Sequence, residues 1–479
     1  MRRDLSALAA REHDVVVVGG GIYGVAVAWD AAERGLAVAL VEREDFGAGT
    51  SWNSLKTIHG GMRYLPKGDL GRLRESAREL RTLLAIAPEV VRPLGFLVPT
   101  YGHGKAGREA FAAGLVLSSW LTAGRNPDLP PPRQVPPGRT VPVEEALRLL
   151  PGLERRGGLT GAALWYDAQA TSTERLTLGF LHAAADAGAL CANHAEVVSL
   201  LRGGGRVRGV AVRDTLGETT VEVRARLVVN AAGPWADAIM TLGGLRRQKV
   251  PLLRARNLVL GRPPHVPFAV GARSGNRFLF LVPWKERTMV GTSYEPAESP
   301  PSDPLDFLEE ARRAFPWARL AREDIALVHE GLVPGRGDAA GLATRLLLVD
   351  HEAEDGLPGL LSLQGVKYTT ARAVAERVVA LAVRRLGGPA TRCRTATTPL
   401  PRARPLEGGL KERARAAVRE EMALTLADAV LRRLDLGTGG PPLEVELDAV
   451  SAVLRTELGW DAAREQAERR ALAAVYPRP

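Results

Sequence analysis

The sequence predicts an α/β protein with a Rossmann-like nucleotide-binding domain, an antiparallel-sheet domain and an all-helical C-terminal domain. Three patterns predict this organisation. A strand, a glycine-rich turn, a helix and a second strand follow one another over residues 13–42. Short strands with alternating apolar residues occupy residues 250–335. Residues 405–479 carry apolar side chains at helical spacing.

Length and composition indicate a globular protein of two or three domains. The chain has 479 residues, 46% hydrophobic and 25% charged, which excludes a disordered or fibrous class. The two cysteines lack a metal-ligand spacing, so we predict no metal site. The formal net charge of +10 comes from scattered arginines, which favours solvated faces. We expect no signal peptide and no membrane-spanning segment.

The N-terminal pattern is typical of a dinucleotide-binding unit. A GxGxxG motif, Gly19, Gly21 and Gly24, stands between a four-valine strand and an alanine-rich helix. The first glycine permits a tight turn, the second lets a pyrophosphate approach the helix N-terminus, and the third lets helix and strand pack closely. Glu42 ends the second strand, where its carboxylate can accept hydrogen bonds from ribose hydroxyls. A glycine-rich turn in an unrelated α/β protein is the alternative.

A polar segment follows this unit directly. Residues 50–65, TSWNSLKTIHGGMRYL, gather hydroxyl, amide and charged side chains around two glycines and offer little apolar surface for burial. Together with the preceding motif, the segment resembles the signature of the FAD-dependent glycerol-3-phosphate dehydrogenase family, which has the D-amino-acid-oxidase-like flavoprotein fold. The resemblance covers nearly the whole chain and implies that the cofactor is FAD.

The resemblance implies that the first half of the polar segment lies along the FAD. Thr50, Ser51 and Ser54 would supply hydroxyl donors, and Lys56 would place a positive charge near the pyrophosphate or the flavin. The alternative for each hydroxyl residue is a helix cap or a turn.

The second half of the segment is expected to meet the flavin and the substrate. Gly60 and Gly61 would let the backbone pass close to the isoalloxazine, and Arg63 with Tyr64 would face the substrate. His59 is a candidate for both the cofactor site and the catalytic base, with a structural histidine as the alternative. For Arg63 and Tyr64 the alternative is an ordinary surface pair.

The segment RLVVNAAGPWAD, residues 226–237, reads as a buried strand that runs into a helix start. The family has a similar element, which implies that Ala232, Gly233 and Trp235 are FAD neighbours. Another core strand with a good helix start is the alternative.

The segment GLLSLQGVKYTTARAVAERVVALAV resembles the family's closing strand, loop and helix. The resemblance implies that Gly365, Lys367 and Thr369 meet the flavin. A helix N-terminus at this place could stabilise negative charge on the reduced cofactor.

These segments give the expected domain organisation. Helices are predicted within residues 70–125, followed by a proline-rich loop, and a further helix begins near Thr173. In chain order we expect FAD-binding residues 1–70, a helical insertion with the proline-rich loop at 71–160, FAD-binding residues 161–245, an antiparallel substrate domain at 246–340, a closing FAD-binding strand and helix at 341–400, and a helical C-terminal domain at 401–479.

Three positions depart from the family's substrate-binding pattern. Asn257 replaces a histidine, Tyr294 replaces an acid and Val333 replaces an arginine. A phosphate dianion needs paired donors, and arginine supplies the best fork for it. The substrate is therefore either a phosphate held by other residues or a different molecule.

Other arginines could complete a phosphate site. Arg254, Arg256 or Arg336 could replace the missing arginine, and Arg345 matches a second family arginine. Arg63 and Arg345 are the arginines expected to bind or polarise the substrate during catalysis.

The resemblance implies oxidation of sn-glycerol 3-phosphate to dihydroxyacetone phosphate, by hydride transfer to flavin N5, with the electrons passed to a quinone. A base must lie within about 3 Å of the hydroxyl proton, directly or through water. His59, His329 and Tyr64 are the candidates, and the sequence does not rank them.

Two alternative functions stay open. One is a related FAD-dependent dehydrogenase or oxidase of another hydroxy acid, polyol or amine, and the other is a non-catalytic flavin- or RNA-binding protein. The scattered arginines and the lack of an RNA-binding motif argue against the second. We expect a small anionic substrate such as a polyol phosphate, a quinone or other electron acceptor, and no nucleic acid. We also expect a cytoplasmic protein, with peripheral contact with the inner membrane and homodimerisation as further expectations.

Overall fold

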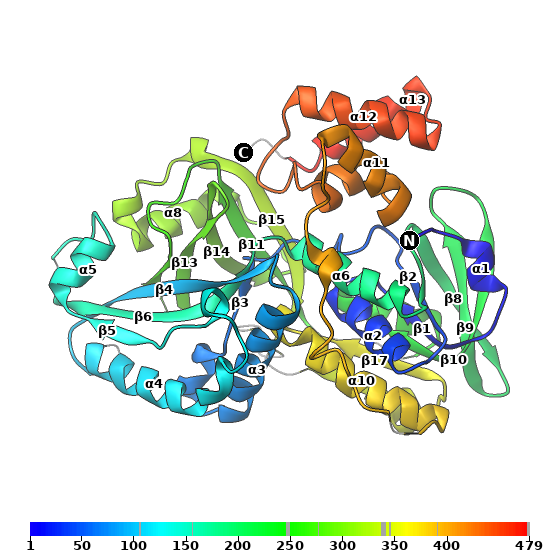
Figure 1. Ribbon diagram of the computed structural model, residues 1–479, viewed down its shortest axis with the longest axis horizontal. Coiled ribbons are helices and arrows are strands. Elements are labelled where there is room, and N and C mark those ends of the chain that lie inside the picture. The colour runs from blue at the N-terminus through cyan, green and yellow to red at the C-terminus, as the bar shows by residue number, and fades with distance from the viewer. Residues whose placement is uncertain are drawn as a thin grey trace.

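The structure, a computed structural model, describes residues 1–104, 107–155, 157–245, 250–275, 277–336, 342–343, 346–389 and 391–476. Its elements divide between an eight-stranded sheet, a nine-stranded sheet and a group of C-terminal helices (Figure 1). In this view the two sheets lie beside each other and the C-terminal helices lie above them. The predicted mixed α/β fold is confirmed.

The eight-stranded sheet carries the nucleotide-binding unit. It consists of β1 (His13–Val18), β2 (Val38–Val41), β7 (Leu190–Ala192), β8 (Ala195–Gly203), β9 (Arg206–Asp214), β10 (Thr220–Asn230), β16 (Leu347–Asp350) and β17 (Leu360–Gln364). The strand order is β16, β17, β10, β1, β2, β7, with β9 and β8 attached to β10. β1 pairs in parallel with both β2 and β10, the arrangement of a doubly wound sheet.

Helices bury one face of this sheet. The helices are α2 (Ile22–Glu33), α6 (Thr173–Asp186) and α10 (Ala371–Leu386), and α2 packs against the other two (Figure 1). The other face is covered by α1 (Leu5–Ala9) and the β8–β9 hairpin. The valines of β1 are therefore buried on both faces, Val15 and Val17 toward α2, and Val16 and Val18 toward the hairpin.

The nine-stranded sheet contains the strands predicted between residues 250 and 335. It consists of β3 (Thr57–Ile58), β4 (Val91–Tyr101), β5 (Arg139–Val141), β6 (Leu159–Ala170), β11 (Leu252–Leu260), β12 (Ala269–Ser274), β13 (Arg277–Trp284), β14 (Arg287–Pro296) and β15 (Ile325–Pro334). The main order is β15, β11, β14, β13, β12, β4, β6, β3, with β5 on β6. The first five strands are antiparallel neighbours, as expected.

The expected helical insertion at residues 71–160 needs a correction. Helices α3 (Leu70–Ile86) and α4 (Arg108–Leu121) are present, but β4 and β5 lie in the same segment and join the second sheet. β6 also belongs to that sheet, although its residues were assigned to the nucleotide-binding part, and β4 pairs in parallel with β12. The β4 sequence contains Pro93 and Pro99, which weaken a strand signal. Its strand conformation therefore depends on pairing with neighbouring strands.

The remaining helices connect these layers. They are α5 (Val143–Leu149), α7 (Ala236–Leu242), α8 (Pro304–Ala314), α9 (His351–Asp355) and the short 3-10 helices η1 (Met62–Lys67), η2 (Ala123–Arg125), η3 (Pro131–Arg133), η4 (Gly233–Trp235), η5 (Pro316–Ala318), η6 (Arg322–Asp324), η7 (Tyr368–Thr370) and η8 (Pro401–Ala403).

The C-terminal helices are fixed to the nucleotide-binding domain by buried charges. They are α11 (Leu410–Glu421), the π-helix η9 (Asp428–Arg433), α12 (Glu444–Leu458) and α13 (Ala462–Ala473). Asp45, just after β2, accepts two hydrogen bonds from Arg433, at 2.7 and 2.8 Å, and one from Arg432 at 2.5 Å. All three residues are buried, so this docking is part of the folded core.

Candidate active site

A cavity of about 540 Å³ opens at the C-terminal ends of β1, β2, β10 and β17. Open α/β sheets bind nucleotides at this edge, and the volume is in the range of small-molecule sites. Most of the residues expected to hold the cofactor line the cavity: Gly19, Gly21, Glu42, Thr50, Ser51, Ser54, Ala232, Gly233, Trp235, Gly365 and Lys367. Six expected cofactor residues do not line it: Gly24, Lys56, His59, Gly60, Gly61 and Thr369.

The turn into α2 forms one wall of the cavity. Gly19 adopts a φ of +108°, and a side chain on Gly24 would collide with the Gly19 carbonyl oxygen. The Ile22 N–H at the start of the helix donates to Ser51 Oγ at 3.0 Å. An anionic group here would meet the positive end of the helix and a hydroxyl donor, so the wall fits a pyrophosphate.

Glu42 lines the cavity beside the same turn. Its Oε2 accepts from the Gly20 N–H at 2.6 Å and its Oε1 from the Glu44 N–H at 2.9 Å. Burial raises the pKa of this carboxyl, and the two backbone donors oppose the shift. Because each carboxylate oxygen has a second lone pair, Glu42 can still accept hydrogen bonds from a ligand's hydroxyls.

Lys56 does not face the cavity, contrary to the expectation that its charge serves the cofactor. Its Nζ donates to Glu174 Oε1 at 2.5 Å, Thr173 Oγ1 at 2.9 Å and the Trp52 carbonyl at 2.7 Å. The side chain is fully buried. The Glu174 carboxylate on α6 therefore neutralises the Lys56 charge. Lys56 is a structural residue that connects the polar segment to that helix.

Lys367 joins the polar segment to the closing strand at the cavity wall. Its Nζ donates to the His59 carbonyl at 3.0 Å and to Ser76 Oγ at 2.7 Å. The His59 N–H donates to Thr369 Oγ1 at 3.1 Å. Burial lowers the pKa of Lys367 to about 7, and the charge of Arg63 contributes to the same direction.

The His59 side chain is held by an aspartate that the sequence did not single out. Its Nδ1 lies 3.3 Å from Asp167 Oδ2, and the Gly60 N–H donates to Asp167 Oδ1 at 2.9 Å. A Cβ on Gly60 would lie 2.7 Å from Asp167 Oδ1, and Gly61 has a φ of +98° against α3. The close approach at both glycines is therefore to the chain's own atoms.

Arg63 and Tyr64 lie next to Lys367. Arg63 is exposed, and its guanidinium donates to Tyr64 Oη at 3.1 Å. The Tyr64 ring is buried, with Lys367 Nζ 5.1 Å from its centroid. A buried tyrosine in this position supports the two cations, but its hydroxyl already accepts a hydrogen bond.

Two further residues, Tyr294 on β14 and Arg277 on β13, belong to the second sheet. Burial of its hydroxyl raises the pKa of Tyr294, and a hydrogen bond with Thr292 and the charges of Arg63 and Arg277 oppose the shift, while the residue as a whole is 39% exposed. Arg277 donates to the Thr292 carbonyl at 2.6 Å and to Glu310 Oε2 at 2.5 Å. Nothing in the sequence around Arg277 singles it out, because its place depends on the pairing of β13 with β14.

His329 is a structural residue, which corrects its place among the candidate bases. It is fully buried between the rings of Trp52 and Trp284, and its Nε2 lies 3.0 Å from the Thr438 carbonyl. Burial lowers the pKa of His329 to about 3. The ring faces the C-terminal helices, so it cannot reach a substrate.

Arg254 and Arg256 are also removed from the expected phosphate site. Each forms ion pairs with both Glu295 and Glu330, at distances of 2.6–3.1 Å. These carboxylates neutralise the two arginines on β11. Neither arginine lines the cavity.

Arg336 and Arg345 are the other two arginines expected to bind the phosphate. Arg336 is exposed and follows β15, whose last residues line the cavity. Arg345 lies outside the described residues.

Comparison with known proteins gives matches over most of the chain. The model of the DAO family, "FAD dependent oxidoreductase", matches residues 14–381. Glycerol-3-phosphate dehydrogenase of Synechocystis sp. is 32% identical, over 83% of this chain and 75% of that protein. Glycerol-3-phosphate dehydrogenase of Mycobacterium leprae is 35% identical, over 78% of this chain and 63% of that protein. This chain thus spans three-quarters of the first relative and a little less than two-thirds of the second.

Solved structures share the fold. The glycerol-3-phosphate dehydrogenase from Bacillus halodurans complexed with FAD aligns with a TM-score of 0.73 and 23% identity, over 98% of this chain and 95% of that one. The FAD-bound L-α-glycerophosphate oxidase from Mycoplasma pneumoniae aligns with a TM-score of 0.57 and 16% identity, over 80% of this chain and 98% of that one.

Proposed function

The chain belongs to the family of FAD-dependent oxidoreductases that includes the glycerol-3-phosphate dehydrogenases, and we propose that it oxidises sn-glycerol 3-phosphate to dihydroxyacetone phosphate. FAD is its cofactor. One observation carries the choice of substrate: the cavity lined by the dinucleotide motif is also lined by Lys367, whose ammonium donates to the His59 carbonyl and is influenced by the charge of Arg63. As an oxidoreductase, the protein is an enzyme, which excludes the purely binding role.

The cavity supports a definite placement of FAD. The α2 N-terminus with Gly21 and Ser51 would hold the pyrophosphate, and Glu42 would hold a ribose. Trp235 lines the same cavity, with the Arg43 guanidinium 4.7 Å from its ring centroid, and would cover the nucleotide end. When bound, FAD accepts the two electrons of the alcohol as a hydride.

Lys367 and Arg63 are the cations that would bind the substrate phosphate. Among the described residues, the Lys367 ammonium has no carboxylate within salt-bridge distance. Arg63 is exposed and donates only to Tyr64 there, so both charges remain available to an anion. Arg277 on β13 does not belong to this set, because the Glu310 carboxylate neutralises its charge and it does not line the cavity. Arg63 was expected at the substrate from the sequence, whereas Lys367 was expected only at the cofactor.

His59 is the base that best fits the geometry. His329 is buried away from the cavity, and the Tyr64 hydroxyl is occupied by Arg63. The His59 side chain is 31% exposed, and no described residue bonds to its Nε2. Oxidation breaks the C2–H bond with its electron pair, and the hydroxyl proton would pass to Nε2 of His59 as the carbonyl forms.

We further propose that the electrons pass to a quinone at a membrane surface. Within the described residues, no helix has the length and apolar character needed to cross a bilayer. α4, however, exposes Val116 and Trp120 by 72% and 73% and has no charged residue between Ala110 and Gly124. An exposed apolar helix with a tryptophan is typical of interfacial contact. Trp120→Ser should reduce co-sedimentation with anionic lipid vesicles, and unchanged binding would contradict this assignment.

The test of the substrate is an anaerobic reaction. The purified holoprotein is mixed with glycerol 3-phosphate, and the flavin absorbance near 450 nm is followed. Rapid bleaching, with dihydroxyacetone phosphate as the product, is the expected outcome. Absence of bleaching with a full complement of FAD would contradict the proposal.

The second candidate is oxidation of another hydroxy acid, polyol or amine by the same site. The observation that favours it is the set of departures at Asn257, Tyr294 and Val333, of which Val333 lines the cavity. Screening such compounds in the same anaerobic assay separates the two functions, because bleaching by a compound without phosphate would select the second.

A further inference from the structure

We infer that Asp167 is a positioning residue that fixes the His59 imidazole with its proton on Nδ1, so that Nε2 is the nitrogen that accepts the substrate proton. The inference rests on the proposed oxidation of an alcohol at this site. Asp167 lies on β6, between β4 and β3 near one edge of the second sheet, and 108 positions from His59 in the sequence.

The tautomer follows from the chemistry of the partners. The carboxylate of Asp167 is an acceptor, and its Oδ2 lies 3.3 Å from Nδ1 of His59. A hydrogen bond between them requires the ring proton on Nδ1. Nε2 then keeps its lone pair and has no partner among the described residues, which is the state that a base needs.

The surroundings hold this pair in one arrangement. Asp167 Oδ1 accepts from the Gly60 N–H at 2.9 Å, so one carboxylate binds both the ring of His59 and the next backbone amide. The His59 backbone is fixed on both sides, by Thr369 Oγ1 and by Lys367 Nζ. The carboxylate is therefore the group that decides how the imidazole ring is turned.

Gly60 has to lack a side chain for this arrangement to exist. A Cβ at this position would lie 2.7 Å from Asp167 Oδ1 and would displace the carboxylate from the backbone amide. The Gly60-Gly61 pair in the polar segment therefore has a local role in seating Asp167.

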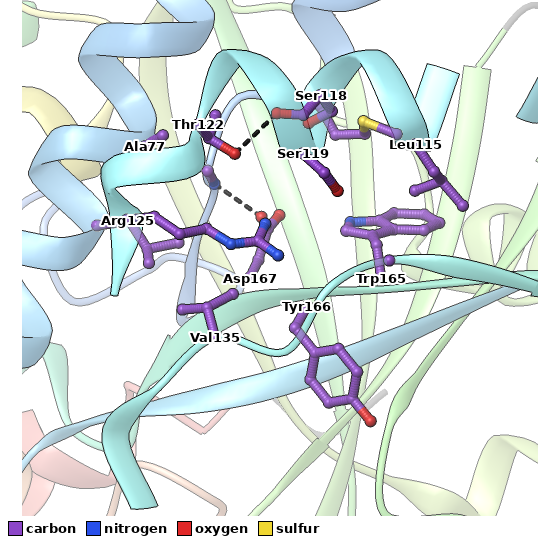
Figure 2. A pocket seen from close by; sticks show the side chains of 14 residues that line it. Ala77, Leu115, Ser118, Ser119, Thr122, Arg125, Val135, Trp165, Tyr166 and Asp167 are labelled. Carbon is purple, nitrogen blue, oxygen red and sulfur yellow. Dashed lines mark hydrogen bonds between the residues drawn. The ribbon is translucent and has the colours of Figure 1, made fainter. Parts of the chain in front are cut away.

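A small cavity lies on the other side of Asp167 (Figure 2). Its volume is about 30 Å³, enough for one or two water molecules, and Ser119, Thr122 and Arg125 contribute to its lining. The Arg125 side chain extends toward Asp167, as Figure 2 shows. Burial lowers the pKa of Arg125, and the charge of Asp167 opposes that shift. The Arg125 guanidinium thus complements the Asp167 carboxylate from the side of this cavity.

The charges that face His59 set the expected pH dependence. Burial lowers the pKa of His59, Asp167 opposes the shift, and the positive charges of Arg63 and Lys367 strengthen it. His59 must be neutral to accept a proton, so activity rises with pH through its pKa. Removing the carboxylate removes the opposing influence, so the acid limb of kcat/KM should move to lower pH.

The first test replaces Asp167 with asparagine, which keeps the size of the side chain. In the Asp167→Asn holoenzyme, kcat should fall by about 100-fold with little change in KM, the range for loss of a positioned base. The acid limb should also move to lower pH. Asp30→Asn is the matched control, because Asp30 is also buried but pairs with Arg34 at the C-terminal end of α2. If Asp167 had only a structural role, both variants would have a lower melting temperature. The kcat and the acid limb of Asp167→Asn would then equal those of Asp30→Asn.

Gly60→Ala is a second variant that leaves every charge in place. It should displace the carboxylate and reproduce the loss of kcat, while FAD content stays that of the wild type. Wild-type kcat in both Gly60→Ala and Asp167→Asn would overturn the inference.

A measurement without substrate separates this inference from the proposed function. The eight histidines are labelled with ¹⁵N in the wild-type holoprotein, and the His59 signals are assigned from a His59→Gln variant. The expected spectrum has a protonated Nδ1 and an unprotonated Nε2 at pH 8. A proton on Nε2 would overturn the inference, even if glycerol 3-phosphate bleaches the flavin. If glycerol 3-phosphate does not bleach the flavin, the proposed substrate is wrong. The spectrum still shows whether Asp167 holds the His59 proton on Nδ1.

Discussion

Lys56 and Lys367 show how two buried lysines of one chain serve different purposes. Both were expected at the cofactor, and both have little exposure, 0% for Lys56 and 9% for Lys367. The Lys56 ammonium lies 2.5 Å from the Glu174 carboxylate. The Lys367 ammonium instead donates to two neutral oxygens, of His59 and Ser76. The comparison therefore separates a compensated charge from one that has no carboxylate partner.

The electrostatic consequences differ accordingly. Burial lowers the pKa of Lys56, but the Glu174 carboxylate opposes the shift, and the Lys56 charge in turn lowers the pKa of Glu174 to about 2 against the effect of burial. Burial lowers the pKa of Lys367 to about 7, because its partners do not compensate for lost hydration. A buried cation with neutral partners gains from any anion that comes near. The difference teaches that the counter-charge, and not burial, distinguishes a structural lysine from a ligand-binding lysine.

The largest expected effect is the loss of stability in Lys56→Met. The Glu174 carboxylate would be left buried without its cation, which should lower the free energy of unfolding by about 3–5 kcal/mol. Urea denaturation followed by circular dichroism measures the change. Lys56→Met combined with Glu174→Leu should recover most of it, because the double variant buries no lone charge. A single variant as stable as the wild type would break the comparison.

Lys367→Met is expected to affect catalysis more than stability. Loss of a charged hydrogen bond to the substrate phosphate, worth about 1.5–3 kcal/mol, should lower kcat/KM by about 10- to 100-fold. The rate of anaerobic flavin bleaching measures the effect, with Lys367→Arg as the control that keeps the charge. If Lys367→Met unfolds as readily as Lys56→Met, the two lysines are both structural.

The pH dependence of substrate binding should sharpen the distinction. Lys367 is charged below its pKa of about 7 and neutral above it, and a phosphate monoester is a dianion above about pH 6. Affinity should therefore be highest between about pH 6 and 7 and fall by up to about 10-fold toward pH 9. KM measured across this range tests the sign. Lys367→Arg, which stays protonated, should abolish the fall, and a flat wild-type profile would contradict it.

The smallest effect is expected at Arg254, whose charge is neutralised near the surface. Arg254→Ala removes ion pairs with Glu295 and Glu330 and should lower the free energy of unfolding by about 1 kcal/mol or less. Because Arg254 does not line the cavity, kcat/KM should change by less than about two-fold. A ten-fold fall in kcat/KM would show that Arg254 does contribute to substrate binding.

The local parts of the site were predictable from the sequence. The strand, GxGxxG turn and helix appear as β1, the Gly19 turn and α2, and the five strands from 250 to 335 appear as β11 to β15. β4 was missed, because its prolines weaken the signal that pairing with β6 and β12 overrides. His329 and Lys56 were wrongly assigned to the active site, because the sequence around a histidine or lysine does not show whether its side chain faces a cavity or the core.

By itself, the sequence determined the fold class, the nucleotide-binding turn and the polar segment beside it. Each depends on backbone geometry or periodicity within a short stretch, so nearby residues suffice to encode it. Only the tertiary structure decided which charges meet. Glu174 reaches Lys56 across 118 positions and Asp167 reaches His59 across 108, and these distant partners determine which cations and which imidazole nitrogen are available to a ligand. Electrostatic roles depend on distance in space, and the chain order does not record it.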